Sequence, residues 1–310
     1  MRWVKRGRVF AVSGEHGWMR SHAQIPTVLP LDDRLRVYFA TRPKPGLSLT
    51  GIVDLDATDP SRIIEVHPEP VLDVGPPGSF DAHGSMPQWV CENGGEVWLY
   101  YGGWSRRVDI PYSNWTGLAI SDDGGLTFRK AFAGPVLDRT RDEIFSATGC
   151  TMLREGGDWH AWYASGTQWV EIDGKLEEVY VIKYAHSRDG ISWERENRQL
   201  LPSLADPEPT HRPSVVEIDG TYHMWFCHRR VRDFRGGAGS YRIGYARSLD
   251  AREWERDDSL AGTDVSPEGW DSEMMAYPYV VRVDDRVLMF YNGNGFGATG
   301  FGVAELVERS

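Results

Sequence analysis

Acidic and histidine side chains stand just before each of five similar segments of the 310-residue chain. The carboxylates in these positions are Asp81, Glu143, Glu208, Asp271 and Glu273, and the histidines are His22, His83 and His211. Carboxyl and imidazole groups that share a pocket can donate and accept protons near neutral pH. These residue types therefore predict acid–base chemistry, although a histidine at the start of a strand can also serve only to cap backbone groups.

Polar, cationic and aromatic side chains flank the same segments. The candidates for ligand binding are His22, Gln24 and Arg212 ahead of the segments, and Arg42, Trp104, Trp169, His228, Arg229 and Asn292 behind them. An indole ring can stack on the apolar C–H face of a sugar ring, and a guanidinium group binds a carboxylate or phosphate through two parallel hydrogen bonds. The set predicts a carbohydrate ligand, and an anionic one unless the arginines pair with neighbouring Asp and Glu residues.

Internal repeats set the positions of these residues along the chain. The five segments begin at Ile25, Met86, Gly149, Arg212 and Tyr277. Each combines a short apolar strand, a turn of Asp, Gly or Asn, and an alternating aromatic strand, as in MPQWVCENGGEVWLYYGGW. This pattern predicts a β-hairpin. The second residues of the segments are Pro26, Pro87, Cys150, Pro213 and Pro278, at successive spacings of 61, 63, 63 and 65 residues.

Two further strands are expected after each hairpin. The segments GLAISDDGGLTFRKAF, IKYAHSRDGISWERE and IGYARSLDAREWERD share a Ser-x-Asp turn followed by an aromatic residue. The last repeat ends with FGVAELVERS and lacks a fourth strand, whereas the N-terminal WVKRGRVF resembles the fourth-strand segments. We therefore expect the N-terminal strand to complete the last blade, which removes unpaired sheet edges. The sequence predicts an all-β fold, a single five-bladed β-propeller domain over residues 1–310 with four antiparallel strands in each blade.

Strand direction brings the candidate residues to one end of such a propeller. In a four-stranded antiparallel blade, the segment before the first strand and the segment after the second strand lie at the same end. The acidic, histidine, arginine and tryptophan candidates all belong to these segments, whereas the turns at the opposite end carry plain Asp, Gly, Glu and Asn. This asymmetry predicts a ligand site built from loops on a rigid scaffold at one end of the axis.

The whole chain resembles the five-bladed β-propeller glycosidases in its repeat length, its proline-led first strands and its Ser-x-Asp-Gly turns. That superfamily includes arabinanases and xylosidases, invertases and levansucrases, neoagarobiose hydrolases, and mannoside phosphorylases. The resemblance implies cleavage of glycosidic bonds by acidic residues from different blades, and some members use His as the acid. Arabinanases carry Asp directly before the first-blade proline, where this chain has Ile25 preceded by Gln24. The usual first-blade base is therefore absent.

The resemblance assigns expected roles to the catalytic candidates. Glu143 is expected to be the general acid, and Asp81 the base or a carboxylate that tunes the pKa of the acid. His83 and His211 would position the sugar or share the proton transfer, and Glu273 is a reserve carboxylate. Two catalytic carboxyl groups about 5–5.5 Å apart would imply retention of configuration, and a separation of about 6.5–9.5 Å would imply inversion.

Three functions are compatible with these residues. The leading hypothesis is an enzyme that hydrolyses glycosidic bonds, with an anionic sugar among its expected ligands. A non-catalytic carbohydrate-binding propeller is the alternative favoured by the missing first-blade Asp. A glycoside phosphorylase or transferase is the third, because a single carboxylate beside an Arg and His cluster would leave phosphate to act as the nucleophile.

Composition limits the partners and the location. The net charge of −11 argues against nucleic acid as a ligand. No run of 18 apolar residues is present, so no membrane span is expected, and the N-terminus lacks the pattern of a signal peptide, which predicts a cytoplasmic protein. The cysteines, Cys91, Cys150 and Cys227, fit buried free thiols. The chain has neither a P-loop nor a His-Glu-x-x-His motif, and we expect no cofactor and no metal ion.

Overall fold

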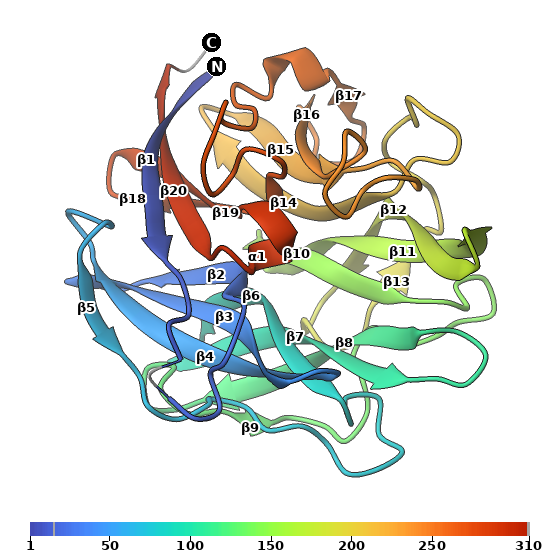
Figure 1. The fold of residues 1–310 in the computed structure, drawn as a ribbon, viewed down its shortest axis with the longest axis horizontal. Helices are drawn as coiled ribbons and strands as arrows, with labels where there is room; N and C mark the ends of the chain where they lie inside the picture. The colour runs from blue at the N-terminus through green and yellow to red at the C-terminus, as the bar shows by residue number, and fades with distance from the viewer. Residues whose placement is uncertain (15, 309–310) are drawn as a thin grey trace.

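The computed structural model describes residues 1–14 and 16–308, and the regular secondary structure of these residues is almost entirely β-strand, as the sequence predicts. Figure 1 shows strands arranged around a centre, with the N-terminal strand beside the C-terminal one. Helical structure in the described residues is limited to a 3-10 turn at Asp258–Leu260 and the single turn α1 (Asn294–Gly297).

The strands form five groups of four within the described residues, and consecutive strands of each group pair antiparallel. Group one contains β2 (Gln24–Pro30), β3 (Arg34–Lys44), β4 (Leu47–Asp56) and β5 (Ile63–Val66). Group two contains β6 (Gly84–Asn93), β7 (Glu96–Arg106), β8 (Tyr112–Ser121) and β9 (Arg129–Lys130). Group three contains β10 (Ala147–Glu155), β11 (Asp158–Ile172), β12 (Lys175–Ser187) and β13 (Glu194–Arg195).

The two remaining groups come from the C-terminal part of the chain and from its first strand. Group four contains β14 (Thr210–Ile218), β15 (Thr221–His228), β16 (Arg242–Ser248) and β17 (Glu255–Arg256). Group five contains β18 (Ala276–Val283), β19 (Arg286–Asn292), β20 (Phe301–Glu308) and β1 (Arg2–Phe10). The antiparallel pairing of β1 with β20, from Arg2 opposite Glu308 to Phe10 opposite Phe301, joins segments from the two ends of the chain.

The first strands of the five groups form a closed cycle. β2 contacts β6, β6 contacts β10, β10 contacts β14, β14 contacts β18, and β18 returns to β2. Short parallel bridges reinforce two of the junctions, Ser48 with Gly84 and Trp115 with Ala147. Buried aromatic and aliphatic side chains fill the space between the groups, including the stacked pair Trp98 and Trp159, whose ring centroids lie 5.7 Å apart.

A recurring ion pair, here called the carboxylate clasp, ties together each of groups two to five. A buried carboxylate just before the first strand contacts a Tyr or His on the second strand and a Lys or Arg on the fourth. The clasps are Asp81 with Tyr101 at 3.0 Å and Lys130 at 2.5 Å, Glu143 with Tyr163 at 2.9 Å and Arg195 at 2.7 Å, Glu208 with His228 at 3.2 Å and Arg256 at 2.8 Å, and Asp271 with Tyr291 at 3.0 Å and Lys5 at 2.8 Å. In every clasp the Tyr or His lies 20 residues after the carboxylate.

Group one has an apolar counterpart of the clasp. The residues at the equivalent positions are Met19 and Phe39, which also lie 20 residues apart, together with Val66 on the fourth strand. Met19 and Phe39 are buried in the main hydrophobic core, and Val66 packs against that core. The same place in the fold is therefore held by an ion pair in four groups and by hydrophobic contacts in the first.

We predict that Asp81→Asn lowers the free energy of unfolding by about 3 kcal/mol, because the change leaves the Lys130 ammonium without its counter-ion. Replacing the whole clasp, with Asp81→Met, Tyr101→Phe and Lys130→Val as in group one, should lower stability much less. Urea denaturation followed by tryptophan fluorescence measures both. Asp122→Asn, the same charge change at an exposed position, is the control, and an Asp81→Asn protein as stable as this control would contradict the clasp.

Candidate active site

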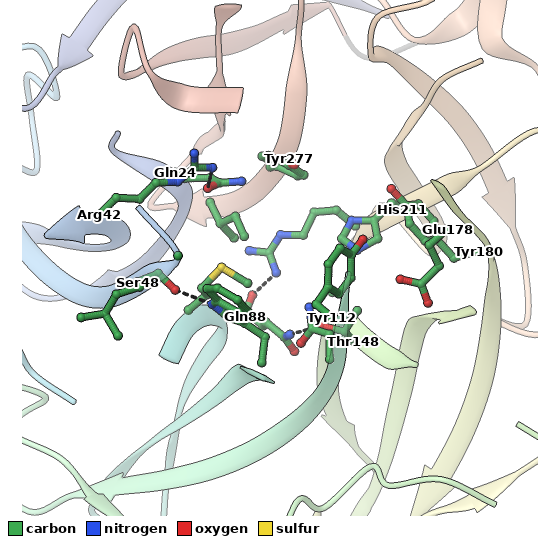
Figure 2. A pocket seen from close by; sticks show the side chains of 18 of the residues that line it. Gln24, Arg42, Ser48, Gln88, Tyr112, Thr148, Glu178, Tyr180, His211 and Tyr277 are labelled. Carbon is green, nitrogen blue, oxygen red and sulfur yellow. Dashed lines mark hydrogen bonds between the residues drawn. The ribbon is translucent and has the colours of Figure 1, made fainter. Parts of the chain in front are cut away.

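A cavity of about 450 Å³ lies between the groups, and Figure 2 shows the side chains around it. Strands and connecting segments from all five groups contribute to its lining. The lining residues are Gln24, Ile25, Arg42, Pro45, Gly46, Leu47, Ser48, Met86, Gln88, Trp104, Tyr112, Asn114, Thr148, Gly149, Glu178, Tyr180, His211, Arg212, Tyr241 and Tyr277. A site shared by five groups is held by the whole ring rather than by a single loop.

Bulges in the first strands turn one residue of each group towards this cavity. The pairing of every first strand with its second strand shifts register near the start of the strand. The lining residues at these bulges are Ile25, Gln88, Gly149, Arg212 and Tyr277. Positive φ angles are found at Ile25 (57°), Gly149 (60°), Arg212 (54°) and Tyr277 (55°). Such a conformation is uncommon for residues with side chains and is often associated with functional sites.

Arg212 connects the first strands across the ring. Its side chain is 1% exposed and donates hydrogen bonds to the Gln88 carbonyl oxygen, to Thr27 Oγ1 at 3.0 Å and to the Cys150 carbonyl oxygen at 3.5 Å. These acceptors belong to groups one, two and three, whereas Arg212 belongs to group four. Burial lowers the pKa of Arg212 to about 10, so the group remains a cation at neutral pH.

Glu178 supplies the one carboxylate among the described residues that line the cavity. It lies on β12 and is 3% exposed. Burial raises the pKa of Glu178 to about 7, although hydrogen bonds from Ser146 and Tyr112 and the charge of Arg229 act in the opposite direction. Gly166 leaves room for this carboxyl group, since a Cβ atom there would come within 2.4 Å of Glu178 Oε1. Glu178 can therefore carry a proton near neutral pH, as a general acid must.

His211 lies beside Glu178 and Tyr180 in Figure 2. Burial, with smaller contributions from the nearby arginines Arg212 and Arg229, lowers the pKa of His211 to about 3, so the imidazole is neutral. Its Nδ1 atom is buried without a hydrogen-bond partner in the described residues. The ring occupies space that Gly149 leaves open, because a Cβ atom there would lie 2.7 Å from His211 Cε1. A neutral imidazole with one free nitrogen can exchange a hydrogen bond with a ligand.

Arg229 supports the wall that carries Glu178. Its guanidinium group donates to the Glu178 carbonyl oxygen at 3.0 Å and to the hydroxyl groups of Tyr241 at 3.2 Å and Tyr180 at 3.4 Å. The ring of Phe234 covers the same guanidinium group, with its centroid 3.7 Å from the Arg229 Cζ atom. Arg229 thus lies behind Tyr180 and Tyr241, which line the cavity.

Arg42 lies on the side of the cavity opposite Glu178 (Figure 2). Its side chain makes one hydrogen bond with the described residues, a long one to Gln24 Oε1 at 3.3 Å, and it forms no ion pair with any of them. Burial lowers the pKa of Arg42 below its ordinary value. The neighbouring His22 has a pKa lowered to about 4, mainly by burial and further by Arg42, so it adds no charge at neutral pH.

Of the residues expected from the sequence to form the site, five lie in the cavity lining: Gln24, Arg42, Trp104, His211 and Arg212. Asp81, Glu143 and His228 instead belong to the clasps. Arg195 and Lys183 hold the pKa of Glu143 below its ordinary value despite burial. A general acid needs a raised pKa, so Glu143 does not fit the acid role expected for it.

The other predicted residues lie one layer behind the lining or away from it. His83 packs on Trp104 with ring centroids 5.8 Å apart, and Trp169 packs on Tyr112 at 5.3 Å. Asn292 is fully buried and holds group five to group one through hydrogen bonds with Ile25 N and Ala23 O, both 2.7 Å long. His22 contacts Ser21 at 3.0 Å, and Glu273 is exposed.

Sequence reasoning missed Glu178, Tyr112, Tyr180 and Tyr241. A signal for Glu178 was present, because a charged pair, Glu177 and Glu178, directly precedes the apolar run VYVI in the strand KLEEVYVIKYAHS. The part of the chain that the structure describes has no cluster of three His, Cys, Asp or Glu side chains able to hold a metal ion. Nor does it contain a helix that is long and apolar enough to cross a membrane.

Solved structures with the same fold as this chain include proteins titled as glycoside hydrolases. A protein titled glycoside hydrolase superimposes with a TM-score of 0.74 at 17% identity, covering 99% of this chain and 92% of its own. A thermostable family-43 glycoside hydrolase gives 0.67 at 16% identity, covering 94% and 91%. The endo-arabinase of Bacteroides thetaiotaomicron VPI-5482 gives 0.66 at 13% identity, covering 98% and 99%.

Sequence comparison gives a closer relationship. The chain is 38% identical over 308 residues to the uncharacterized protein Rv1502 of Mycobacterium tuberculosis H37Rv, covering 99% of both chains, and it belongs to the same family as that protein. A shorter similarity, 30% identity over 122 residues, links 37% of this chain to 38% of a beta-1,2-mannobiose phosphorylase from Thermoanaerobacter sp. X514. No protein-family model matches the chain.

The raised pKa of Glu178 predicts a pH-dependent loss of stability. The protonated carboxyl group stabilises the fold below the ordinary pKa of 4.5, and this contribution is lost as the pH rises through about 7. Glu178→Gln cannot ionise. Relative to the wild type, it should therefore gain stability between pH 5 and pH 8, by an amount on the order of 3 kcal/mol.

Urea denaturation across this pH range tests the prediction, with Glu65→Gln at an exposed position as the control. Parallel curves of stability against pH for the wild type and Glu178→Gln would show that Glu178 does not titrate near neutral pH.

Proposed function

We propose that this protein is an enzyme that breaks glycosidic bonds, with Glu178 as the proton donor. The observation that carries the proposal is a single buried carboxyl group, with a pKa of about 7, facing a cavity of about 450 Å³. The fold shared with glycoside hydrolases supports it. In this proposal the five strand groups are the blades of a five-bladed propeller that forms one domain, and the protein is cytoplasmic with no nucleic-acid partner.

The cavity lining suits a carbohydrate. Trp104, Tyr180 and Tyr277 supply aromatic rings, which can cover the apolar face of a sugar ring. Hydroxyl and amide groups that can bind sugar hydroxyls come from Ser48, Gln88, Asn114 and Thr148. The Asn114 side-chain oxygen is buried with no partner among the described residues, as is the His211 Nδ1 atom. A ligand that supplies donors and acceptors would satisfy both.

In the catalytic step, Glu178 gives its proton to the glycosidic oxygen as the bond from that oxygen to the anomeric carbon breaks. Below about pH 7 the carboxyl group is protonated, so activity that depends on this transfer falls as the pH rises past 7. Hydrolysis by the usual scheme needs a second carboxyl group to activate water or to attack carbon. Among the described lining residues, Glu178 is the one carboxylate.

This single carboxylate favours a second candidate, phosphorolysis. A phosphate oxygen would attack the anomeric carbon, the glycosidic C–O bond would break, and the proton from Glu178 would remain on the leaving oxygen. The products would be a sugar phosphate and the shortened sugar. Arginines without carboxylate partners in the described residues, Arg42 and Arg212 in the lining and Arg229 behind it, support an anionic reactant or an anionic sugar. The partial similarity to a beta-1,2-mannobiose phosphorylase points the same way.

We predict that Glu178→Gln slows turnover by about 10²–10⁴-fold on a glycoside with a poor leaving group, the range expected for general acid catalysis. The loss should be far smaller on an activated aryl glycoside, whose leaving group needs little protonation. A glycoside panel assayed with and without inorganic phosphate measures both effects and separates hydrolysis from phosphorolysis. Gly166→Ala, which displaces the Glu178 carboxyl group, should show the same pattern.

Glu65→Gln serves as the control for the change of charge. Equal losses on both classes of glycoside would remove Glu178 from the acid role, and unchanged turnover would remove it from the mechanism. A wild-type protein that binds sugars but cleaves no glycoside, with or without phosphate, would be a carbohydrate-binding module instead.

A further inference from the structure

The cationic groups of the cavity differ in how far the protein satisfies their hydrogen-bonding capacity. A guanidinium group has five N–H donors. Arg212 directs its terminal nitrogens at the Gln88 and Cys150 carbonyl oxygens and at Thr27 Oγ1. Arg229 donates to four oxygen atoms: the hydroxyls of Tyr180 and Tyr241 and two backbone carbonyls. Both arginines are therefore committed mainly to the structure of the ring and its wall.

Arg42 has no comparable set of partners. Its side chain makes one hydrogen bond, at 3.3 Å, to the Gln24 side chain, and no described carboxylate pairs with it. Its environment withdraws it from water, and a charge in that situation is costly unless an opposite charge compensates it. The nearby titratable groups provide no such charge, because His22 is neutral and burial raises the pKa of Tyr277 well above its ordinary value. The side chain nevertheless lines the cavity.

Arg42 lies apart from Glu178, the proposed proton donor. Arg42 lies on β3 of group one and Glu178 on β12 of group three, and the two lie on opposite sides of the cavity in Figure 2. A ligand that reaches both residues would meet the acid at one end and the free guanidinium group at the other. A guanidinium fork binds carboxylate and phosphate oxygens in pairs, through charge-assisted hydrogen bonds.

We infer that Arg42, assisted by Gln24, is the subsite that binds an anionic group, a carboxylate or a phosphate, in this cavity. The inference rests on the proposed function for the identity of the ligand as a carbohydrate or its phosphate co-substrate. It does not depend on catalysis. The anion could be part of the sugar or could be free phosphate, and both would use the same fork.

The test is calorimetric titration of the purified protein at constant ionic strength with inorganic phosphate, glucuronate and uncharged glucose. Phosphate or glucuronate should bind to the wild type more tightly than glucose does. Arg42→Gln should weaken the binding of that anion by about 10-fold to 100-fold, the range expected for a charge-assisted hydrogen bond, and should leave glucose binding unchanged. Binding of phosphate alone would identify a free anion as the ligand, and binding of glucuronate alone an anionic sugar.

Two further variants separate the explanations. Arg42→Lys keeps the charge but loses the fork, and should bind the anion with intermediate affinity. Arg188→Gln makes the same charge change at an exposed position outside the cavity and should bind like the wild type. Because the Arg42 side chain makes a single long hydrogen bond with the described residues, Arg42→Gln should melt within a few degrees of the wild type, which would show that a loss of affinity is not a loss of folding.

Equal anion affinity in Arg42→Gln and the wild type would overturn the inference, as would a wild type that binds neither anion more tightly than glucose. Glu178→Gln distinguishes this failure from a failure of the proposed function. If no glycoside is cleaved but anion binding still depends on Arg42 and not on Glu178, the subsite is established and the proposed catalysis is not.

Discussion

The arrangement of this fold depends on the buried carboxylate that precedes the first strand in four of its five groups. Antiparallel pairing holds each strand only to its neighbours, so a four-stranded group needs another contact to fix its first strand relative to its fourth. The clasp supplies it, because one carboxylate reaches the second strand through Tyr or His and the fourth strand through Lys or Arg. Group one fills the same place with Met19, Phe39 and Val66. An ion pair is therefore one solution and hydrophobic packing is another, since well-packed apolar residues can often replace a buried ion pair without loss of stability.

The clasps also limit the chemistry of the cavity, because they occupy the four buried carboxylates that precede first strands. In the clasps of groups three and four the cationic partner keeps the carboxylate ionised: the pKa of Glu143 lies below its ordinary value and that of Glu208 is about 2, despite burial. Glu178 is buried with hydroxyl partners and no cation in an ion pair, and its pKa rises to about 7. Buried glutamates in this protein therefore have either a lowered or a raised pKa, depending on whether a counter-ion is buried beside them. Glu178, which has no ion-pair partner, can exchange a proton near neutral pH, and its side chain lines the cavity.

Much of the fold could be predicted from the sequence, because the hairpin pattern repeats with nearly constant spacing and the N-terminal segment resembles the fourth strands. Strand direction also indicated five residues of the cavity lining, including Arg42 and His211. Strand direction could not distinguish residues that line the cavity from residues one layer behind them. His83 and Trp169 were therefore expected in the site, but they pack against Trp104 and Tyr112, which line the cavity. Glu178 was missed because the expected site was drawn from the segments around the first two strands of each group, whereas third strands also line the cavity, as Ser48 on β4 and Asn114 on β8 do. The constant spacing of 20 residues between Asp81 and Tyr101, or Glu143 and Tyr163, was visible in the sequence and would have marked those carboxylates as structural.

The bulges explain how one backbone scaffold can carry different chemistry. Each positive φ angle at a residue with a side chain costs on the order of 1–3 kcal/mol, and Ile25, Arg212 and Tyr277 all adopt one. Their strain is tolerable because the closed ring and the clasps fix the surrounding backbone. Each first strand carries a bulge near its start, but the lining residues at the bulges are Ile25 and Gln88 in groups one and two, Gly149 in group three, and Arg212 and Tyr277 in groups four and five. The bulges therefore present an aliphatic and an amide side chain at one part of the ring and cationic and phenolic side chains at another, while Gly149 between them leaves the space that His211 fills. The side chains that contact a ligand therefore differ from one side of the cavity to the other, and the residue that each group places at its bulge determines how the ligand is oriented.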